Sequence, residues 1–261
     1  MSCFVPYSDW LKEQNWINKG DCLYVVSDMM ELAKVYRECG QRLNLDELLT
    51  DLQGLVGEEG TLVLPTFNWD FCKGVTFDYH KTPVRTGALP KAALKRTDFT
   101  RTWHPLYSFA VWGSRAQELL AVDSPDSFGE GTIFEKLEQW DAKVLVIGVG
   151  ALAGTTYIHH VEQVVGVPYR YNKEFTADYI DGEGVCSKRT CRMFVRDLDM
   201  DPRHINGFEP LEKQMYAEGM IQGGMYSRVP CHFLTVRALD KAVAKDILEN
   251  DSRNMYTYHH L

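Results

Sequence analysis

The stretch GTTYIHHVE, which ends at Glu162, sets two histidines and a carboxylate within four positions after a hydrophobic segment. If Thr155 or Thr156 caps a helix, His159 and Glu162 lie three residues apart on one helical face. A carboxylate beside an imidazole raises the pKa of the imidazole and fixes its tautomer. Such a pair can remove a proton from an attacking nucleophile. The alternative is that His159 or His160 packs or bonds locally and that Glu162 is solvated.

Three turns at predicted strand ends could face this pair. Ser27 and Asp28 follow the first predicted strand, and Thr66 follows the second. Gly148 and Gly150 follow the strand that leads to the histidines. In open α/β sheets, ligands collect beyond the carboxyl ends of the strands, where helix N-termini offer free N–H groups. We therefore expect these turns to converge, and the glycine turn to bind an anion or a polarised carbonyl oxygen.

Two further signals are weaker. His104 precedes Pro105, which holds it extended at the start of a strand, where it could supply a polar group to a cleft. A structural histidine is the more common outcome for such a residue, by roughly two to one. Glu130 stands between Gly129 and Gly131, and glycines permit unusual backbone angles or a close approach to a ligand. This segment matches neither a GxGxxG motif nor a P-loop.

The elements around these residues alternate between strands and helices. Strands are predicted at 20–28, 106–113 and 143–150, and helices at 29–40, 43–56 and 114–121. Residues 57–67 are predicted to form a turn and then a strand, and residues 128–140 a glycine-rich turn that leads into a helix. This alternation predicts a layered α/β/α fold with a mostly parallel central sheet. From about Lys173 the pattern changes to a β-hairpin that turns at residues 181–184, which predicts a β-rich C-terminal elaboration. We expect a single domain spanning residues 1–261.

The composition is that of an ordinary globular protein, with 45% hydrophobic and 25% charged residues. A net charge of −8 argues against nucleic acid as a partner. The seven cysteines are scattered without a CxxC pair, so we expect a reduced, cytoplasmic protein without a metal site. The start of the chain does not resemble a signal peptide and no apolar run reaches transmembrane length, so no membrane partner is expected.

Taken together, these segments resemble the aminoglycoside 3-N-acetyltransferase family, whose fold is unrelated to that of the GNAT acetyltransferases. The resemblance covers about residues 19–173 and rests on several motifs in the same order. They are GDCLYVVSD, EGTLVLPTFNW, TPVRTGALPKAALKR, RTWHPLYSFAVWG, SFGEGTIFEKL, KVLVIGVG with TTYIHHVE, and VPYR. An ordered set is far more specific than any one short motif.

The resemblance implies the transfer of an acetyl or other short acyl group from acyl-CoA to the amine of an amino sugar by direct attack. The catalytic residues of the family correspond to His159, Glu162 and Thr156, and His160 is then a bystander. Its cofactor-binding residues correspond to Ser27, Asp28, Arg85, Thr86, Gly87 and Thr155. Its substrate side corresponds to Thr66, His104 and Glu130. No metal is implied.

Departures from the family pattern leave the acceptor open. Val26-Ser27-Asp28 stands where the family commonly has His-Ser-Ser, and Thr155 stands at its usual Asn. The acceptor is either an aminoglycoside or a nucleotide-linked amino sugar, and a homodimer is left open. One alternative is a CoA-binding homologue without activity. Another is a metal-dependent hydrolase that uses the histidines and Glu162, although adjacent histidines point to different faces of a helix.

Overall fold

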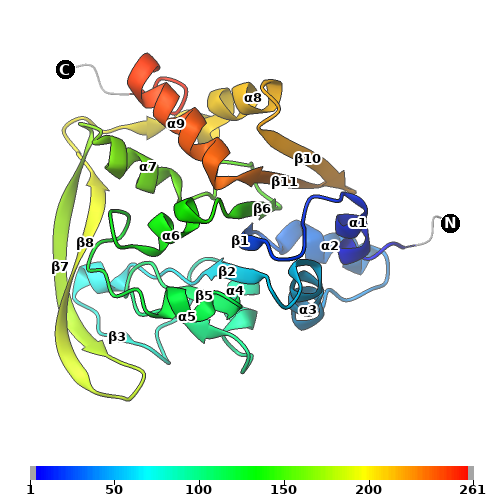
Figure 1. The fold of residues 1–261 in the computed structure, drawn as a ribbon, viewed down its shortest axis with the longest axis horizontal. Coiled ribbons are helices and arrows are strands. Elements are labelled where there is room, and N and C mark those ends of the chain that lie inside the picture. Colours follow the sequence, from blue (N-terminus) through cyan, green and yellow to red (C-terminus); the bar gives the residue numbers. More distant parts are fainter. Residues whose placement is uncertain (1–3, 258–261) are drawn as a thin grey trace.

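A seven-stranded mixed sheet forms the centre of the molecule (Figure 1). The structure is a computed structural model and describes residues 4–257. The strand order in this sheet is β10-β11-β6-β1-β2-β5-β4. The strands are β1 (Cys22–Ser27), β2 (Thr61–Pro65), β4 (Thr100–Arg101), β5 (Phe109–Gly113), β6 (Lys143–Ile147), β10 (Ile221–Tyr226) and β11 (Val229–Thr235).

The three central strands of this sheet are parallel, and the outer pairs are antiparallel. β1 pairs in parallel with β2 and β6, whereas β5 and β11 run antiparallel to their neighbours. Five of the seven strands therefore point in one direction, because only β5 and β11 are reversed. The prediction of a mostly parallel sheet is confirmed in this sense. Ser27 pairs with Ile147, so the carboxyl ends of β1 and β6 lie side by side.

Helices cover both faces of the sheet, as the alternating side chains of β1 require. Leu23 and Val25 pack into one apolar core, and Tyr24 and Val26 pack into the other. The first core contains residues of α1 (Tyr7–Glu13), α2 (Met30–Glu38), α3 (Leu45–Val56) and α4 (Ala88–Ala93). The second contains residues of α5 (Ala116–Leu120), α6 (Ile133–Gln139), α7 (Ile158–Val165), α8 (Glu209–Ala217) and α9 (Val236–Asn250). The predicted α/β/α layering is confirmed.

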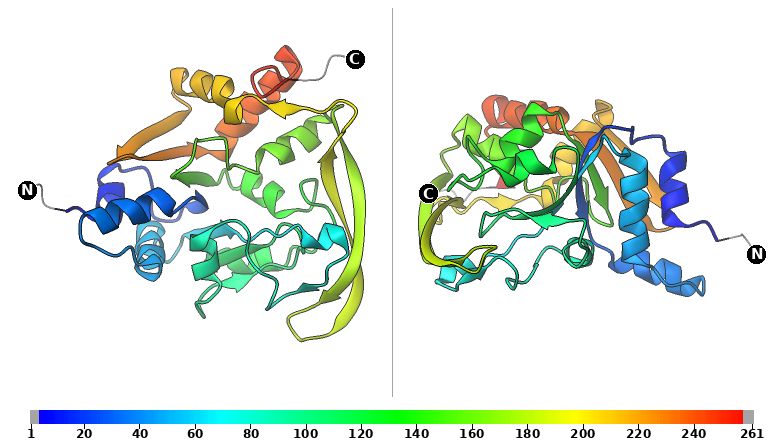
Figure 2. Two further views of the ribbon diagram at one scale, coloured as in Figure 1. Left: turned by 180° about the vertical axis from the view of Figure 1, so that it is seen from behind. Right: turned by 60° about the horizontal axis from the view of Figure 1, so that its bottom comes forward.

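A long β-hairpin forms the end of the molecule that lies farthest from the N-terminus (Figures 1 and 2). Its strands are β7 (Arg170–Ile180) and β8 (Cys186–Arg196), and Ile180 pairs with Cys186 across the turn. The predicted turn at residues 181–184 is therefore confirmed. The remaining strands are short: β3 (Phe77–Asp78) pairs with β7, and β9 (Arg203–His204) pairs with β12 (Tyr256–Thr257). Two 3-10 turns complete the structure, η1 (Asp70–Lys73) and η2 (Asn206–Phe208).

Several helices begin where a polar side chain accepts a hydrogen bond from the free backbone N–H groups. Asn44 caps α3, Thr132 caps α6 and Thr235 caps α9 in this way. At the start of α2, the Asp28 carboxylate accepts from the N–H of Met30. Within residues 4–257, no helix is both long and apolar enough to cross a membrane.

Candidate active site

Two glycines let the loop after β6 fold back onto the end of β1. Gly148 has a φ of +80°, and a Cβ at this position would collide with the Asp28 carbonyl oxygen. A Cβ added to Gly154 would lie 2.8 Å from Cγ1 of Val26. The loop therefore reaches the first residues of α7 along the carboxyl edge of the sheet, where ligands collect in folds of this kind. This close approach explains why the glycines precede the histidines.

The start of α7 differs from the prediction. The N-cap residue is Tyr157, and no side chain caps the helix. The Thr155 hydroxyl instead donates to the Ala151 carbonyl at 2.9 Å and is buried, so its polar atom is used inside the loop. Thr156 is half-buried, and its carbonyl accepts from the N–H of His159 at 3.0 Å. The prediction that Thr155 or Thr156 caps the helix is wrong, because the turn enters α7 already in helical geometry.

His159 and Glu162 form the pair that their spacing predicts. His159 Nδ1 lies 2.7 Å from Glu162 Oε2, and 24% of the His159 side chain is exposed while Glu162 has none of its surface exposed. Since an ionised carboxylate can only accept hydrogen bonds, Nδ1 carries the hydrogen and Nε2 carries the lone pair. The carboxylate thus holds Nδ1 of the imidazole, and Nε2 is the ring nitrogen that is left to accept a proton.

Glu162 has partners that the sequence did not reveal. Arg170 Nε lies 2.8 Å from Oε2, and the Tyr169 hydroxyl donates to Oε1 at 3.2 Å. The Arg170 guanidinium also donates to the Tyr256 hydroxyl at 3.3 Å. Arg170 and Tyr169 belong to the VPYR segment, which marked their place in the sequence but not their role. Tyr256 lies far along the chain on β12, and no local pattern links it to α7.

The surroundings keep the His159 imidazole neutral. Burial and the nearby Arg170 guanidinium lower the pKa of His159 below its ordinary value, although Glu162 acts in the opposite direction. Glu162 does raise this pKa, as its position beside the imidazole predicts, but the loss of water and the Arg170 charge outweigh it, so the net shift is downward. Burial alone would raise the pKa of Glu162, but His159 and Arg170 hold it below its ordinary value. A neutral imidazole beside an ionised carboxylate is the protonation state that a general base needs.

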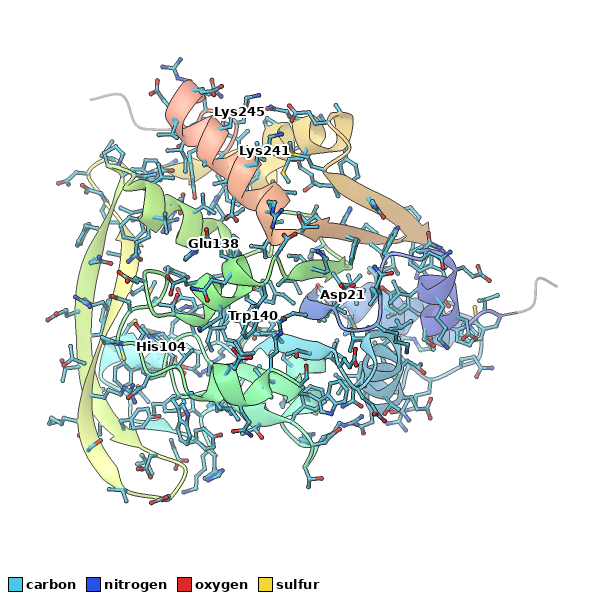
Figure 3. All side chains as sticks on the ribbon, viewed as in Figure 1. Asp21, His104, Glu138, Trp140, Lys241 and Lys245 are labelled. Carbon is cyan, nitrogen blue, oxygen red and sulfur yellow. The ribbon has the colours of Figure 1, made fainter. Side chains whose placement is uncertain are left out.

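His160 serves the structure on the other side of α7. Its side chain is 2% exposed, its Nδ1 donates to the Phe128 carbonyl, and its Nε2 lies 3.0 Å from Glu138 Oε2. Glu138 lies on α6 (Figure 3). The Phe128 ring in turn packs edge-on against His159, with 5.5 Å between the ring centroids. His160 thus ties α7 to α6 and to the loop whose phenylalanine contacts the His159 ring.

Four residues predicted on the cofactor side line one pocket at the ends of β1 and β2. The pocket has a volume of about 590 Å³ and is lined by Ser27, Asp28, Thr86 and Gly87. Its apolar lining consists of Met29, Met30, Ala33, Leu43, Leu45 and Ala88. The Thr86 hydroxyl donates to the Pro65 carbonyl, and the Ser27 carbonyl lies against Gly87, which has a φ of +116°. A pocket of this size and mixed lining is of the kind that holds small-molecule ligands.

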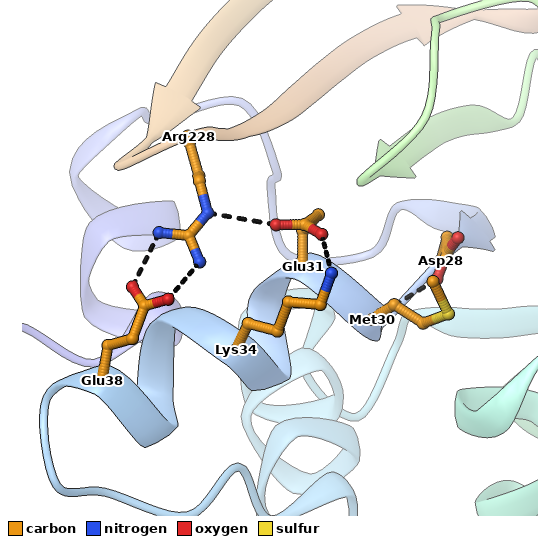
Figure 4. A network of polar contacts seen from close by, with 6 residues as sticks. All are labelled: Asp28, Met30, Glu31, Lys34, Glu38 and Arg228. Atoms are coloured by element: carbon orange, nitrogen blue, oxygen red, sulfur yellow. Dashed lines mark hydrogen bonds and ion pairs between the residues drawn. The ribbon is translucent and has the colours of Figure 1, made fainter.

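Asp28 occupies the helix end that faces this pocket. Its Oδ1 accepts from the N–H of Met30 at 2.9 Å, at the first residue of α2 (Figure 4). Farther along α2, Arg228 pairs with Glu31 at 3.0 Å and with Glu38 at 2.7 Å. The helix is thereby held against the turn between β10 and β11, while its N-terminus already carries a negative charge.

A family model described as aminoglycoside 3-N-acetyltransferase matches residues 24–248. The chain belongs to this family. Members of the aminoglycoside 3-N-acetyltransferase family are acetyl-CoA-dependent N-acetyltransferases, so the chain is an enzyme of this class and acetyl-CoA is its co-substrate. Both the α/β/α layers and the ordered motifs agree with that membership.

Solved structures with the same fold include several aminoglycoside acetyltransferases. A complex of AAC-IIIb with CoASH is 20% identical, with a TM-score of 0.76 over 93% of this chain and 94% of that one. AAC-VIa bound to sisomicin is 15% identical, with a TM-score of 0.76 over 93% and 96%. The YokD protein from Bacillus subtilis is 20% identical, with a TM-score of 0.74 over 93% and 92%.

Two positions that correspond to the cofactor side of aminoglycoside 3-N-acetyltransferases lie elsewhere in this chain. The Arg85 guanidinium does not line the pocket and pairs with Asp70 at 2.8 Å. Thr155 turns its hydroxyl into its own loop. Neither residue is among those that line this pocket, and the contact of each with the cofactor stays a prediction.

The three residues predicted on the substrate side lie in different surroundings. Thr66 is fully buried, with 2.8 Å between its hydroxyl and that of Ser108, so no ligand can reach its side chain. His104 Nδ1 accepts from the N–H groups of Leu106 and Tyr107 at 3.2 and 3.0 Å, and burial lowers the pKa of His104 to about 3. These two bonds are of the kind that a structural histidine makes, and contact between His104 and the substrate stays a prediction. Glu130 is exposed near the end of the loop that leads into α6.

Residues 4–257 contain no ligand set for the metal-dependent hydrolase that the sequence left as an alternative. No three His, Cys, Asp or Glu side chains in this part of the chain gather in a metal-binding arrangement. His159 and His160 point toward Glu162 and Glu138 respectively, on different faces of α7. Adjacent histidines on a helix diverge in this way because successive side chains are about 100° apart.

Proposed function

We propose that this enzyme acetylates the amino group of an aminoglycoside by direct attack on acetyl-CoA, with His159 as the general base and Glu162 as its orienting partner. One observation carries the proposal: His159 Nδ1 is bound at 2.7 Å to a fully buried carboxylate, while 24% of the histidine side chain is exposed. Three solved structures of the same fold are named as aminoglycoside acetyltransferases, which supports an aminoglycoside as the acceptor.

The reaction follows from the chemistry of these groups. The acceptor amine attacks the thioester carbonyl, and His159 Nε2 takes the proton that the nitrogen loses as the new C–N bond forms. The Thr156 hydroxyl, which precedes His159 by three residues, donates to the oxygen that becomes negative. When the C–S bond breaks, the imidazolium returns the proton to the CoA thiolate. No acyl-enzyme forms, and none of the cysteines takes part.

The pocket beside Ser27 is the place that we propose for acetyl-CoA. Ser27, Thr86 and Gly87 offer backbone and hydroxyl groups, and the apolar lining suits the pantetheine arm. The pocket lies at the end of β1, which is adjacent to the end of β6 and to the loop that leads to His159. AAC-IIIb, which has the same fold, was solved with CoASH.

The overall charge favours a cationic acceptor. A protein with a net charge of −8 attracts polyamines such as aminoglycosides. AAC-VIa, another protein of this fold, was solved with sisomicin.

The cytoplasmic location and the homodimer stay predictions.

The deciding experiment incubates the pure protein with acetyl-CoA and a panel of aminoglycosides and nucleotide-linked amino sugars. Free CoA and acetylated product are separated by chromatography, because the exposed thiols Cys39 and Cys186 would react with a thiol reagent. Acetylated aminoglycoside supports the proposal. Turnover with nucleotide-linked sugars alone overturns the proposed acceptor. Binding of acetyl-CoA without turnover on any amine overturns the proposal and supports a non-catalytic homologue.

A further inference from the structure

A second pocket adjoins the one beside Ser27. It has a volume of about 800 Å³ and lies between the start of α3 and the end of α4, so we call it the α3 pocket. Leu43 and Leu45 line both pockets, which places the two side by side along the loop before α3. A donor that lies in the pocket beside Ser27 must direct its thioester toward His159. Its other end then extends past these two leucines.

The two pockets differ in charge. Arg42, Lys95 and Arg96 line the α3 pocket, whereas no described residue that lines the pocket beside Ser27 is cationic. Arg42 and Lys95 are exposed, and within residues 4–257 neither side chain has a hydrogen bond or an ion pair. Arg96 is instead held by Asp98 at 2.8 Å. Arginine and lysine side chains without a protein partner are the groups that bind phosphate oxygens.

The α3 pocket also contains acceptors. Asp46 and Glu47 line it from the first turn of α3, and the side chain of Asn44 accepts from the N–H groups of both. The end of the helix is therefore already capped and is not itself the anion site. Carboxylates accept hydrogen bonds from amino groups, and adenine carries an exocyclic amino group. The lining thus suits a ligand that has both phosphates and an amino-bearing base.

We propose that the α3 pocket binds the nucleotide end of acetyl-CoA, with Arg42 and Lys95 as the cationic contacts of its phosphates. This inference rests on the proposed place of acetyl-CoA in the pocket beside Ser27. The pantetheine arm lies in that pocket, and the nucleotide lies between α3 and α4. Because the whole protein carries a net charge of −8, a polyanionic donor needs cations at its own site.

The test compares ligands with and without phosphates. In the double variant Arg42→Gln with Lys95→Gln, the dissociation constant of CoA, measured by calorimetry, should rise about tenfold. Added salt should weaken binding less in this variant than in the wild type, because fewer charges are left to screen. The kcat/KM for acetyl-CoA should fall by the same factor, while that for S-acetylpantetheine, which has no phosphate, should not change. Both side chains are exposed and unpaired, so the fold should be unaffected.

Lys91→Gln is the matched control. Lys91 is exposed on α4 and lines neither pocket, so its loss should leave the affinity for CoA unchanged. An equal loss of kcat/KM for both donors in the double variant would overturn the inference, since the cations would then not act through the phosphates.

Ala33→Phe separates this inference from the proposed place of the pantetheine arm. Ala33 is exposed on α2 and lines the pocket beside Ser27, so the added ring should weaken the binding of CoA and of S-acetylpantetheine alike. Normal affinity for CoA in the Arg42 and Lys95 variant, with Ala33→Phe impaired, overturns the inference alone. Normal affinity for CoA in Ala33→Phe overturns the proposed place of the arm, and the nucleotide site with it.

Discussion

The two ends of the candidate active site are built in different ways. At the reaction end, the carboxylate of Glu162 is fully buried and is contacted by His159, Arg170 and Tyr169. At the cofactor end, Ser27 and Asp28 line an open pocket of about 590 Å³, and Asp28 uses its carboxylate to cap its own helix. The reaction end is thus held in a single arrangement, while the cofactor end is an accessible surface.

The difference reflects what each end has to do. A general base must be held in one orientation and one tautomer, which requires buried partners on every side but the working one. A binding pocket for a long ligand needs room and a few polar groups. Substitutions at the reaction end should therefore change kcat or the stability of the fold, and substitutions at the cofactor end should change KM.

The largest expected effect is that of His159→Ala. Removing a positioned general base lowers kcat by about 100- to 10,000-fold. Because the pocket beside Ser27 is separate from the imidazole, the dissociation constant of acetyl-CoA, measured by calorimetry, should not change. The exposed His80 provides the control, and His80→Ala should keep normal turnover. Near-normal kcat in the His159 variant would refute the base assignment.

The next largest effect concerns the stability of the fold. It compares Arg170 at the reaction end with Arg228 at the cofactor end. Arg170→Met leaves the buried Glu162 carboxylate without its cationic partner and should lower the free energy of unfolding by about 3–5 kcal/mol. Arg228→Met breaks exposed ion pairs with Glu31 and Glu38 of α2 and should cost far less, because water screens these charges. Urea unfolding of both variants measures the difference. Equal losses would show that the reaction end is no more tightly built than the cofactor end.

Glu162→Gln should lower kcat by about a hundredfold or less, the lower end of the range for general base catalysis. It should also move the pH profile in a defined direction. Burial and Arg170 lower the pKa of His159, so the acidic limb of kcat/KM lies below the ordinary histidine value in the wild type. Glu162 raises this pKa, and its removal should shift the limb to still lower pH. An unshifted limb would mean that the two side chains are not coupled.

The smallest effect is expected at the cofactor end. Asp28→Ala removes a negative charge from the N-terminus of α2 and frees the Met30 N–H group for an anionic ligand. The KM for acetyl-CoA should fall about two- to fivefold with kcat unchanged. Asp28→Asn keeps an acceptor for the Met30 N–H but removes the charge, so comparing the two variants separates charge from access. A higher KM in both would show that Asp28 assists binding.

Local patterns in the sequence determined much of this protein. The alternation of strands and helices predicts the α/β/α layers, because each period places its apolar side chains on one face. The turn at residues 181–184 follows from its glycines, and the pairing of His159 with Glu162 follows from their spacing on a helix. Each of these features depends on residues that are close together in the chain.

Only the tertiary structure decided how these residues are surrounded. Arg170 and Tyr256 join Glu162 because the hairpin and the C-terminal strand pack against α7. The Arg170 charge and the loss of water outweigh the upward pKa shift that Glu162 gives His159. Packing likewise turns Thr66 into the core and Thr155 into its own loop. Burial and long-range partners are properties of the packed chain, and hence no local pattern of residues carries them.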